Sequence, residues 1–128
     1  MLRNLAAALA LTLLSQMAMA LGLGTLKQSS GLNEPFNARI GILSATAADL
    51  ETILVRLADA EQFERAGVGR DGVLLQLRFK VVEGSSGADY IQVTSREPIR
   101  EPFLNFLLEL NWAKGRIVRE YTVLLDPP

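Results

Sequence analysis

Residues 103–125 decide the fold, and they read FLNFLLELNW, AKG and RIVREYTVLL in succession. Alternate side chains of the first segment would lie on one face of a strand, and they are apolar: Leu104, Phe106, Leu108, Leu110 and Trp112. The same segment also fits a helix that presents Phe103, Phe106, Leu107 and Leu110 on one face. Residues 113–115 predict a tight turn, and the segment after them is rich in β-branched residues. A hairpin of two long strands therefore accounts for both halves.

Shorter segments before this hairpin also alternate or are rich in β-branched residues. They predict strands over residues 24–29, 36–42, 52–58, 73–83 and 90–95, with residues 84–87 as a hairpin loop. Residues 50–57 fit a helical stripe as well, but their brevity and β-branched content favour a strand.

Two short helical segments are predicted between these strands. Thr46 and Asp49 have the spacing of a capping box, which would start one helical turn. Residues 60–66 predict a short helix that stops at Gly67 and is anchored by Phe63. About seven short strands with one or two short helices indicate a mainly β protein, an immunoglobulin-like β-sandwich.

The first 20 residues read as a signal peptide helix rather than as part of the fold. Arg3 supplies the positive start, residues 5–14 are apolar, and small residues precede a cleavage site between Ala20 and Leu21. A membrane-spanning helix needs about 20 uninterrupted apolar residues, which this segment lacks. We therefore expect a mature domain over residues 21–128, exported to a bacterial periplasm.

Composition excludes several chemistries. The 128 residues include no His and no Cys, so a Ser-His-Asp triad, an ordinary zinc or haem site and a disulfide are all ruled out. The net charge of −1 makes nucleic acid a poor partner. We predict no catalytic residue, no cofactor and no metal.

Carboxylates near the C-terminus leave one enzymatic alternative open. A pair of them could hydrolyse a glycan, and the candidates are Glu97, Glu101, Glu109, Glu120 and Asp126. Basic residues alternate with these carboxylates, which is more typical of a solvated strand face. Trp112 and Tyr121 could stack on sugar rings, although their apolar surroundings favour a place in the core.

A candidate partner surface lies around two prolines. Pro98 and Pro102 bracket a short segment that belongs at a sheet edge or in a connection. Arg96, Arg100 and Glu101 flank these prolines and could dock a protein partner. They could equally protect an edge from pairing.

Several short runs, taken in order along the chain, carry a resemblance to a known family. The first of them are LGLG (21–24), which alone would be weak, LNEPFNA (32–38), VRLA (55–58) and FERAG (63–67). The most specific part comprises VTS (93–95), REPFL (100–104), NW (111–112) and REYTVLLDPP (119–128). Together these runs resemble the N-terminal periplasmic domain of the FimV family, polar landmark proteins tied to type IV pilus assembly and twitching motility.

The resemblance implies a non-enzymatic interaction module that supports pilus secretin assembly, twitching motility and cell-pole organisation. Its partners would be secretin, assembly or cell-wall proteins in the periplasm, and peptidoglycan is a further candidate. The alternative is a peptidoglycan-binding or carboxylate-based glycan hydrolase domain. Family members usually continue into a linker, a LysM module, a membrane helix and a cytoplasmic region. We therefore expect an N-terminal fragment or a short relative, anchored in a membrane only if the native protein continues beyond Pro128.

Overall fold

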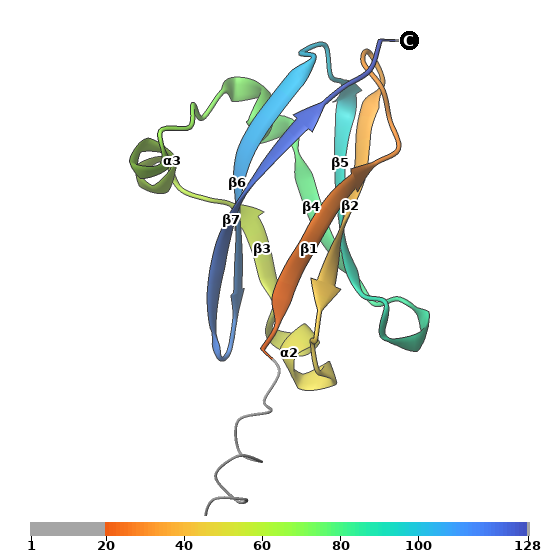
Figure 1. Cartoon of the computed structure of the whole chain (residues 1–128), viewed down its shortest axis with the longest axis vertical. Coiled ribbons are helices and arrows are strands. Elements are labelled where there is room, and N and C mark those ends of the chain that lie inside the picture. Colours follow the sequence, from red (N-terminus) through yellow and green to blue (C-terminus); the bar gives the residue numbers. More distant parts are fainter. Residues whose placement is uncertain (1–19, 128) are drawn as a thin grey trace, which may run out of the picture.

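Two antiparallel sheets face each other in the computed structural model, which describes residues 20–127 (Figure 1). The first sheet has the strand order β1-β2-β5-β4, and the second has the order β3-β6-β7. The bounds are β1 Gly22–Gln28, β2 Pro35–Leu43, β3 Leu54–Leu57, β4 Arg78–Val82, β5 Tyr90–Pro98, β6 Phe103–Trp112 and β7 Gly115–Leu124. The predicted mainly β sandwich is confirmed. The predicted signal peptide lies outside the described residues, apart from Ala20.

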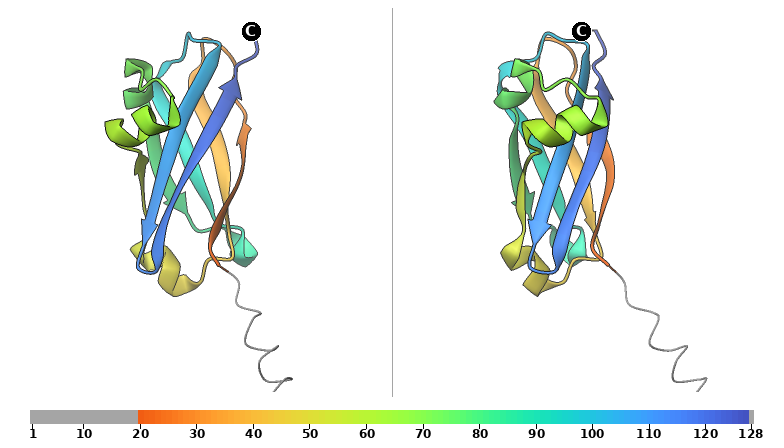
Figure 2. Two further views of the ribbon diagram at one scale, coloured as in Figure 1. Left: turned by 60° about the vertical axis from the view of Figure 1, so that its left-hand side comes forward. Right: turned by 90° about the vertical axis from the view of Figure 1, so that its left-hand side faces the viewer.

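The hydrophobic core fills the space between the two sheets, which Figure 2 shows face to face. Alternate residues of β2 supply Phe36, Ala38, Ile40 and Ile42 to it, as the period of two in the sequence predicts. Phe106 of β6 crosses the core. Its ring centroid lies 6.3 Å from that of Phe79 in the first sheet and 5.9 Å from that of Tyr121 beside it.

The predicted C-terminal hairpin is confirmed as β6 and β7. They pair in continuous register from Phe103 opposite Leu124 to Trp112 opposite Gly115. β6 is buried on both faces over its middle, where Leu107 and Glu109 lie on the side away from the core. A strand covered on both faces reads as an unbroken apolar run, and this explains why its sequence also fitted a helix.

Both short helices form, and α2 is longer than the single turn predicted. α2 covers Ala47–Thr52 and begins with the predicted capping box between Thr46 and Asp49. Because α2 extends to Thr52, β3 is shorter than the strand predicted over residues 52–58. α3 covers Ala60–Ala66 and ends at Gly67, whose φ of 70° is left-handed.

The strand predicted over residues 73–83 is wrong in its first half. Residues Gly72–Gln76 form a 3-10 helix, η1, and β4 begins only at Arg78. Leu74 and Leu77 are both buried, and a spacing of three places both on one side of a 3-10 helix but on opposite faces of a strand.

The hairpin loop predicted over residues 84–87 joins β4 and β5, which pair antiparallel. It contains a second 3-10 turn, η2 (Ser85–Gly87). A Cβ at Gly84 would lie 2.0 Å from the Ala88 carbonyl oxygen, so the chain can close here only on glycine.

Candidate functional site

Two adjoining hollows lie at the end of the sandwich where β5 leads into β6, at the top of Figure 1. The first has a volume of about 230 Å³ and is lined by Val73, Gln76, Glu97, Pro98, Arg100 and Glu101. The second has a volume of about 150 Å³ and is lined by Gly67, Val68, Gly69, Asp71, Val73, Leu74, Glu101, Phe103, Leu104 and Asn105. They share Val73 and Glu101, so we treat them as one feature, the end hollow.

The β5–β6 connection is held rigidly beside the end hollow. Ile99 is buried, its N–H donates to the carbonyl of Glu34 at 3.0 Å, and its carbonyl accepts from Asn33 N–H at 2.8 Å. The carbonyl of Pro102 accepts from Leu125 N–H at 2.8 Å. A buried anchor and these bonds fix the backbone on both sides of Arg100 and Glu101, whose side chains are exposed.

The predicted partner surface is only partly assembled at this site. Arg100 and Glu101 both line the end hollow, whereas Arg96 is exposed on β5 and is not among the lining residues. Sequence reasoning missed Val73 and Gln76 because it placed them in a strand. The spacing of Leu74 and Leu77 was the signal that could have identified η1 there.

The end hollow combines charge with exposed apolar surface. Its lining includes the carboxylates of Asp71, Glu97 and Glu101 and the guanidinium of Arg100. The ion pairs of the described residues all lie elsewhere. Phe103, which lines it, is 51% exposed. Small-molecule sites are mostly enclosed and apolar, whereas this lining is rich in charged and exposed side chains, so the hollow suits side chains of a protein partner better than a cofactor.

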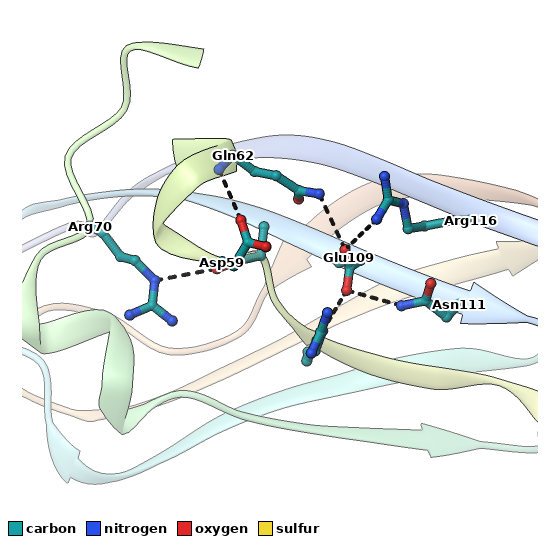
Figure 3. A network of polar contacts seen from close by, with 8 residues as sticks. Asp59, Gln62, Arg70, Glu109, Asn111 and Arg116 are labelled. Atoms are coloured by element: carbon teal, nitrogen blue, oxygen red, sulfur yellow. Dashed lines mark hydrogen bonds and ion pairs between the residues drawn. The ribbon is translucent and has the colours of Figure 1, made fainter. Parts of the chain in front are cut away.

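A second polar feature, the Glu109 network, lies on the outer face of the second sheet (Figure 3). Glu109 is fully buried, although its side chain points away from the core. Its carboxylate accepts from Arg56 Nε, from Asn111 Nδ2 at 3.0 Å, from Gln62 Nε2 at 3.4 Å and from Arg116 Nη1 at 3.5 Å. The prediction of a solvated face is therefore wrong for Glu109.

Burial alone would raise the pKa of Glu109. The hydrogen bonds from Arg56 and Asn111 and the positive charges of Arg56 and Arg116 outweigh it, and the pKa lies below the ordinary 4.5. A carboxylate held ionised in this way is a poor proton donor, so Glu109 does not suit the acid role in glycan hydrolysis. Its contacts instead tie β3, β6, β7 and α3 together.

Local contacts stabilise both ends of α3. Asp59 caps its start by accepting from Gln62 N–H at 2.9 Å. Arg70, beyond its end, donates from Nε to the carbonyl of Ala58 at 3.3 Å and lies 5.7 Å from the centroid of the Phe63 ring. Figure 3 shows both side chains beside the helix.

The other predicted carboxylates do not gather into one cluster. Glu97 and Glu101 line the end hollow, while Glu120 is exposed on the outer face of β7 and Asp126 is exposed near the C-terminus. Within residues 20–127, no group of three or more acidic side chains is arranged to hold a metal ion.

The two aromatic candidates for sugar stacking belong to the core, as predicted. Tyr121 is buried, and its hydroxyl donates to the Gly24 carbonyl at 2.9 Å. Burial raises the pKa of Tyr121, which keeps the hydroxyl protonated as a donor. Trp112 is half-buried against the core.

The comparisons with known proteins agree with this geometry. A family model described as the FimV N-terminal domain, an Ig-like domain, matches residues 21–128. The chain belongs to this family. The resemblance seen in the sequence and the immunoglobulin-like fold are thereby confirmed.

Two curated members of this family were found, each named motility hub protein FimV, from two strains of Pseudomonas aeruginosa. Each is 44% identical to this chain over all 128 residues, and the chain spans 14% of their length. No solved structure matches the chain. Across residues 20–127, no helix has the length and hydrophobicity needed to cross a membrane.

Proposed function

We propose that this chain is a non-enzymatic interaction module of the periplasm that supports type IV pilus secretin assembly, twitching motility and cell-pole organisation. One observation carries the proposal: the whole chain matches proteins named for a motility hub at 44% identity. The absence of His and Cys from the sequence and the ionised, fully bonded Glu109 both argue against common hydrolytic chemistries.

Export is supported by the signal pattern of residues 1–20 and by where the fold begins. Leu21 is buried in the core, and the family match also starts at residue 21. We expect the chain recovered from the periplasmic fraction of the source cells to begin at Leu21, as read by N-terminal sequencing. A chain that retains Met1 in every fraction would contradict export by cleavage.

The end hollow supplies the proposed contact surface. It lies beside a rigid connection, and its lining carries the unpaired charges of Arg100 and Glu101 next to the exposed ring of Phe103. A few well-placed anchors beside a pocket dominate the affinity of many protein interfaces.

Reversing two charges in the hollow tests this surface. We expect Arg100→Glu with Glu101→Arg to leave the melting temperature unchanged within about 2 °C, because both side chains are exposed. The same double variant should weaken partner binding. A photo-crosslinking amino acid at Gln76 would report that binding, through the yield of the adduct formed in living cells and identified by mass spectrometry.

The matched control is Glu61→Arg with Arg65→Glu on α3, which swaps an exposed ion pair and preserves net charge. This control should leave the adduct from Gln76 at full yield. Equal yields from both double variants would contradict the assignment of the end hollow as the contact surface.

A further inference from the structure

The two sides of the sandwich are closed in different ways. On one side, side chains bridge the edge strands β1 and β7. Arg119 Nη1 donates to the carbonyls of Leu23 and Gly24 at 2.5 and 2.9 Å, the Tyr121 hydroxyl also reaches Gly24, and Gln28 Nε2 donates to the Leu124 carbonyl at 2.6 Å. Two backbone carbonyls of β1, those of Leu23 and Gly24, therefore already have partners on this side, and the Gln28 side chain bridges to β7 further along.

The other side, between the edge strands β3 and β4, lacks such bridges. In the part of the chain that the structure describes, β4 pairs only with β5, and no other backbone or side-chain hydrogen bond reaches Arg78–Val82. A strand edge with unpaired N–H and C=O groups is a template for an added strand. We call this side the β3–β4 seam.

Along β4, apolar side chains that face the core alternate with basic side chains that face solvent, and this alternation favours a partner strand of matching pattern. Phe79 and Val81 of β4 point toward the core and stay half-buried, as do Val55 and Leu57 of β3. Apolar side chains on a partner strand would cover this surface and exclude water from it.

The opposite face of β4 is basic. Arg78 and Lys80 point outward and are exposed, and the register places Lys80, Gln92, Arg39 and Lys27 in one row across the first sheet. The four strands of this sheet hold five cationic residues but a single carboxylate, Glu97, at the end of β5 beside the end hollow. None of the five forms an ion pair with another described residue.

The cationic outer face of the first sheet disfavours an added strand with basic side chains and favours one with carboxylates. Lys27 and Arg39 are direct cross-strand neighbours, an arrangement that destabilises an isolated sheet. Carboxylates spaced two residues apart on an added strand would stand opposite Arg78 and Lys80.

We propose that the free edge of β4 binds an extended segment of a partner protein in which carboxylate and apolar side chains alternate. The segment would add as a fifth strand to the first sheet, with its carboxylates facing Arg78 and Lys80 and its apolar side chains entering the β3–β4 seam. This inference deepens the proposed function and rests on it, since it gives the interaction module a second contact of defined chemistry.

A second copy of this chain is a poor occupant of the same edge. Antiparallel pairing between the β4 strands of two chains would bring the cations at positions 78 and 80 of both chains together on one face of the sheet. Basic residues on edge strands prevent such self-pairing. The same charges leave the edge open to an acidic strand.

The test is an NMR titration of the purified, 15N-labelled chain with three blocked seven-residue peptides. The first alternates Glu and Val, the second has Lys in place of each Glu, and the third is the first with every backbone nitrogen methylated. We expect the acidic peptide to shift the amide signals of residues 78–82 and to bind about tenfold more tightly than the Lys peptide. The methylated peptide should not bind, because it lacks the backbone donors of a strand.

Charge variants complete the test. Arg78→Glu with Lys80→Glu should reverse the preference, so that the Lys peptide binds more tightly. The matched control, Lys27→Glu with Arg39→Glu, makes the same change in net charge on the same face but leaves β4 intact, and it should still bind the acidic peptide there. If the reversed variant loses its dispersed spectrum, Arg78→Gln with Lys80→Gln replaces it and should remove the preference.

Three results would overturn the inference: no shift at residues 78–82 with any peptide, equal binding of the methylated peptide, or a concentration-dependent dimer through β4. These results are separable from those of the proposed function. A failed titration together with an adduct from Gln76 would remove only the β4 contact. Peptide binding without that adduct would sustain the β4 contact and contradict the end hollow.

Discussion

Replacing Phe106 by alanine is expected to lower the free energy of unfolding by about 3–5 kcal/mol. Phe106 is fully buried at the centre of β6, and its ring joins Phe79 of the first sheet to Tyr121 of the second. The variant loses these contacts and leaves a cavity. The sheets cannot move together to close it, because hydrogen bonds between the strands fix the shape of each sheet. Equilibrium unfolding in urea, monitored by the fluorescence of Trp112, measures the change.

The control for this variant lies on the same strand. Phe103→Ala removes an identical side chain that is 51% exposed, and it should cost less than about 1 kcal/mol. Equal losses from the two substitutions would contradict the packing described here, because they would mean that Phe106 is no more buried than Phe103.

Glu109→Gln is expected to destabilise the fold by about 2 kcal/mol at pH 7. The amide keeps the size of the side chain but loses the charge-assisted bonds to Arg56 and Arg116. The two guanidinium side chains are 64% and 56% exposed, so water can solvate them, and the cost stays below that of breaking a fully buried pair. Glu120→Gln, at an exposed site on β7, should change stability by less than about 0.5 kcal/mol.

The loss caused by Glu109→Gln should depend on pH in one direction. The pKa of Glu109 is lower in the folded chain than its ordinary 4.5, so the unfolded chain takes up the proton first as the pH falls. The stabilisation by Glu109 is therefore complete above about pH 6 and declines from about pH 5 downward. It is lost once the pH passes below the folded pKa. The free energies of unfolding of the wild-type protein and of Glu109→Gln should converge between pH 7 and pH 3. A difference that widens toward low pH would contradict a lowered pKa in the folded chain.

The elements with strong local signals could be predicted from the sequence. The capping box at Thr46, the glycine stop at Gly67 and the turn between β6 and β7 each depend on contacts between near neighbours, and all three form. Alternation along β2 likewise predicted which side chains enter the core, because one face of that strand is buried and the other is not.

Features that depend on distant packing could not be predicted in the same way. The sequence of residues 73–76 alternates like a strand, but the core accepts Leu74 and Leu77 from one side, and this requires η1. Glu109 reads as one of several surface carboxylates. Side chains of α3 and of the neighbouring strands β3 and β7 meet its carboxylate on the outer face of the sheet, and no local pattern encodes this meeting.

In the candidate site too, the part marked by neighbouring residues could be predicted and the part contributed by distant residues could not. The prolines at positions 98 and 102 correctly marked an exposed connection between strands, and Arg100 and Glu101 do line the hollow beside it. The opposite wall comes from η1 and the loop before it, about 30 residues earlier in the chain, so its contribution was not visible in the sequence. Arg96 was grouped with the site by proximity in sequence, but it lies outside the lining.

The measurement that tests the central proposal most directly is the twitching of cells whose own gene carries Arg100→Glu with Glu101→Arg. Twitching zones should shrink to less than about half of the wild-type diameter, while immunoblots show equal amounts of protein. Cells with the matched swap of Glu61 and Arg65 should twitch normally. Wild-type zones from the first strain, at equal protein level, would contradict the proposal that this module acts in motility through the end hollow.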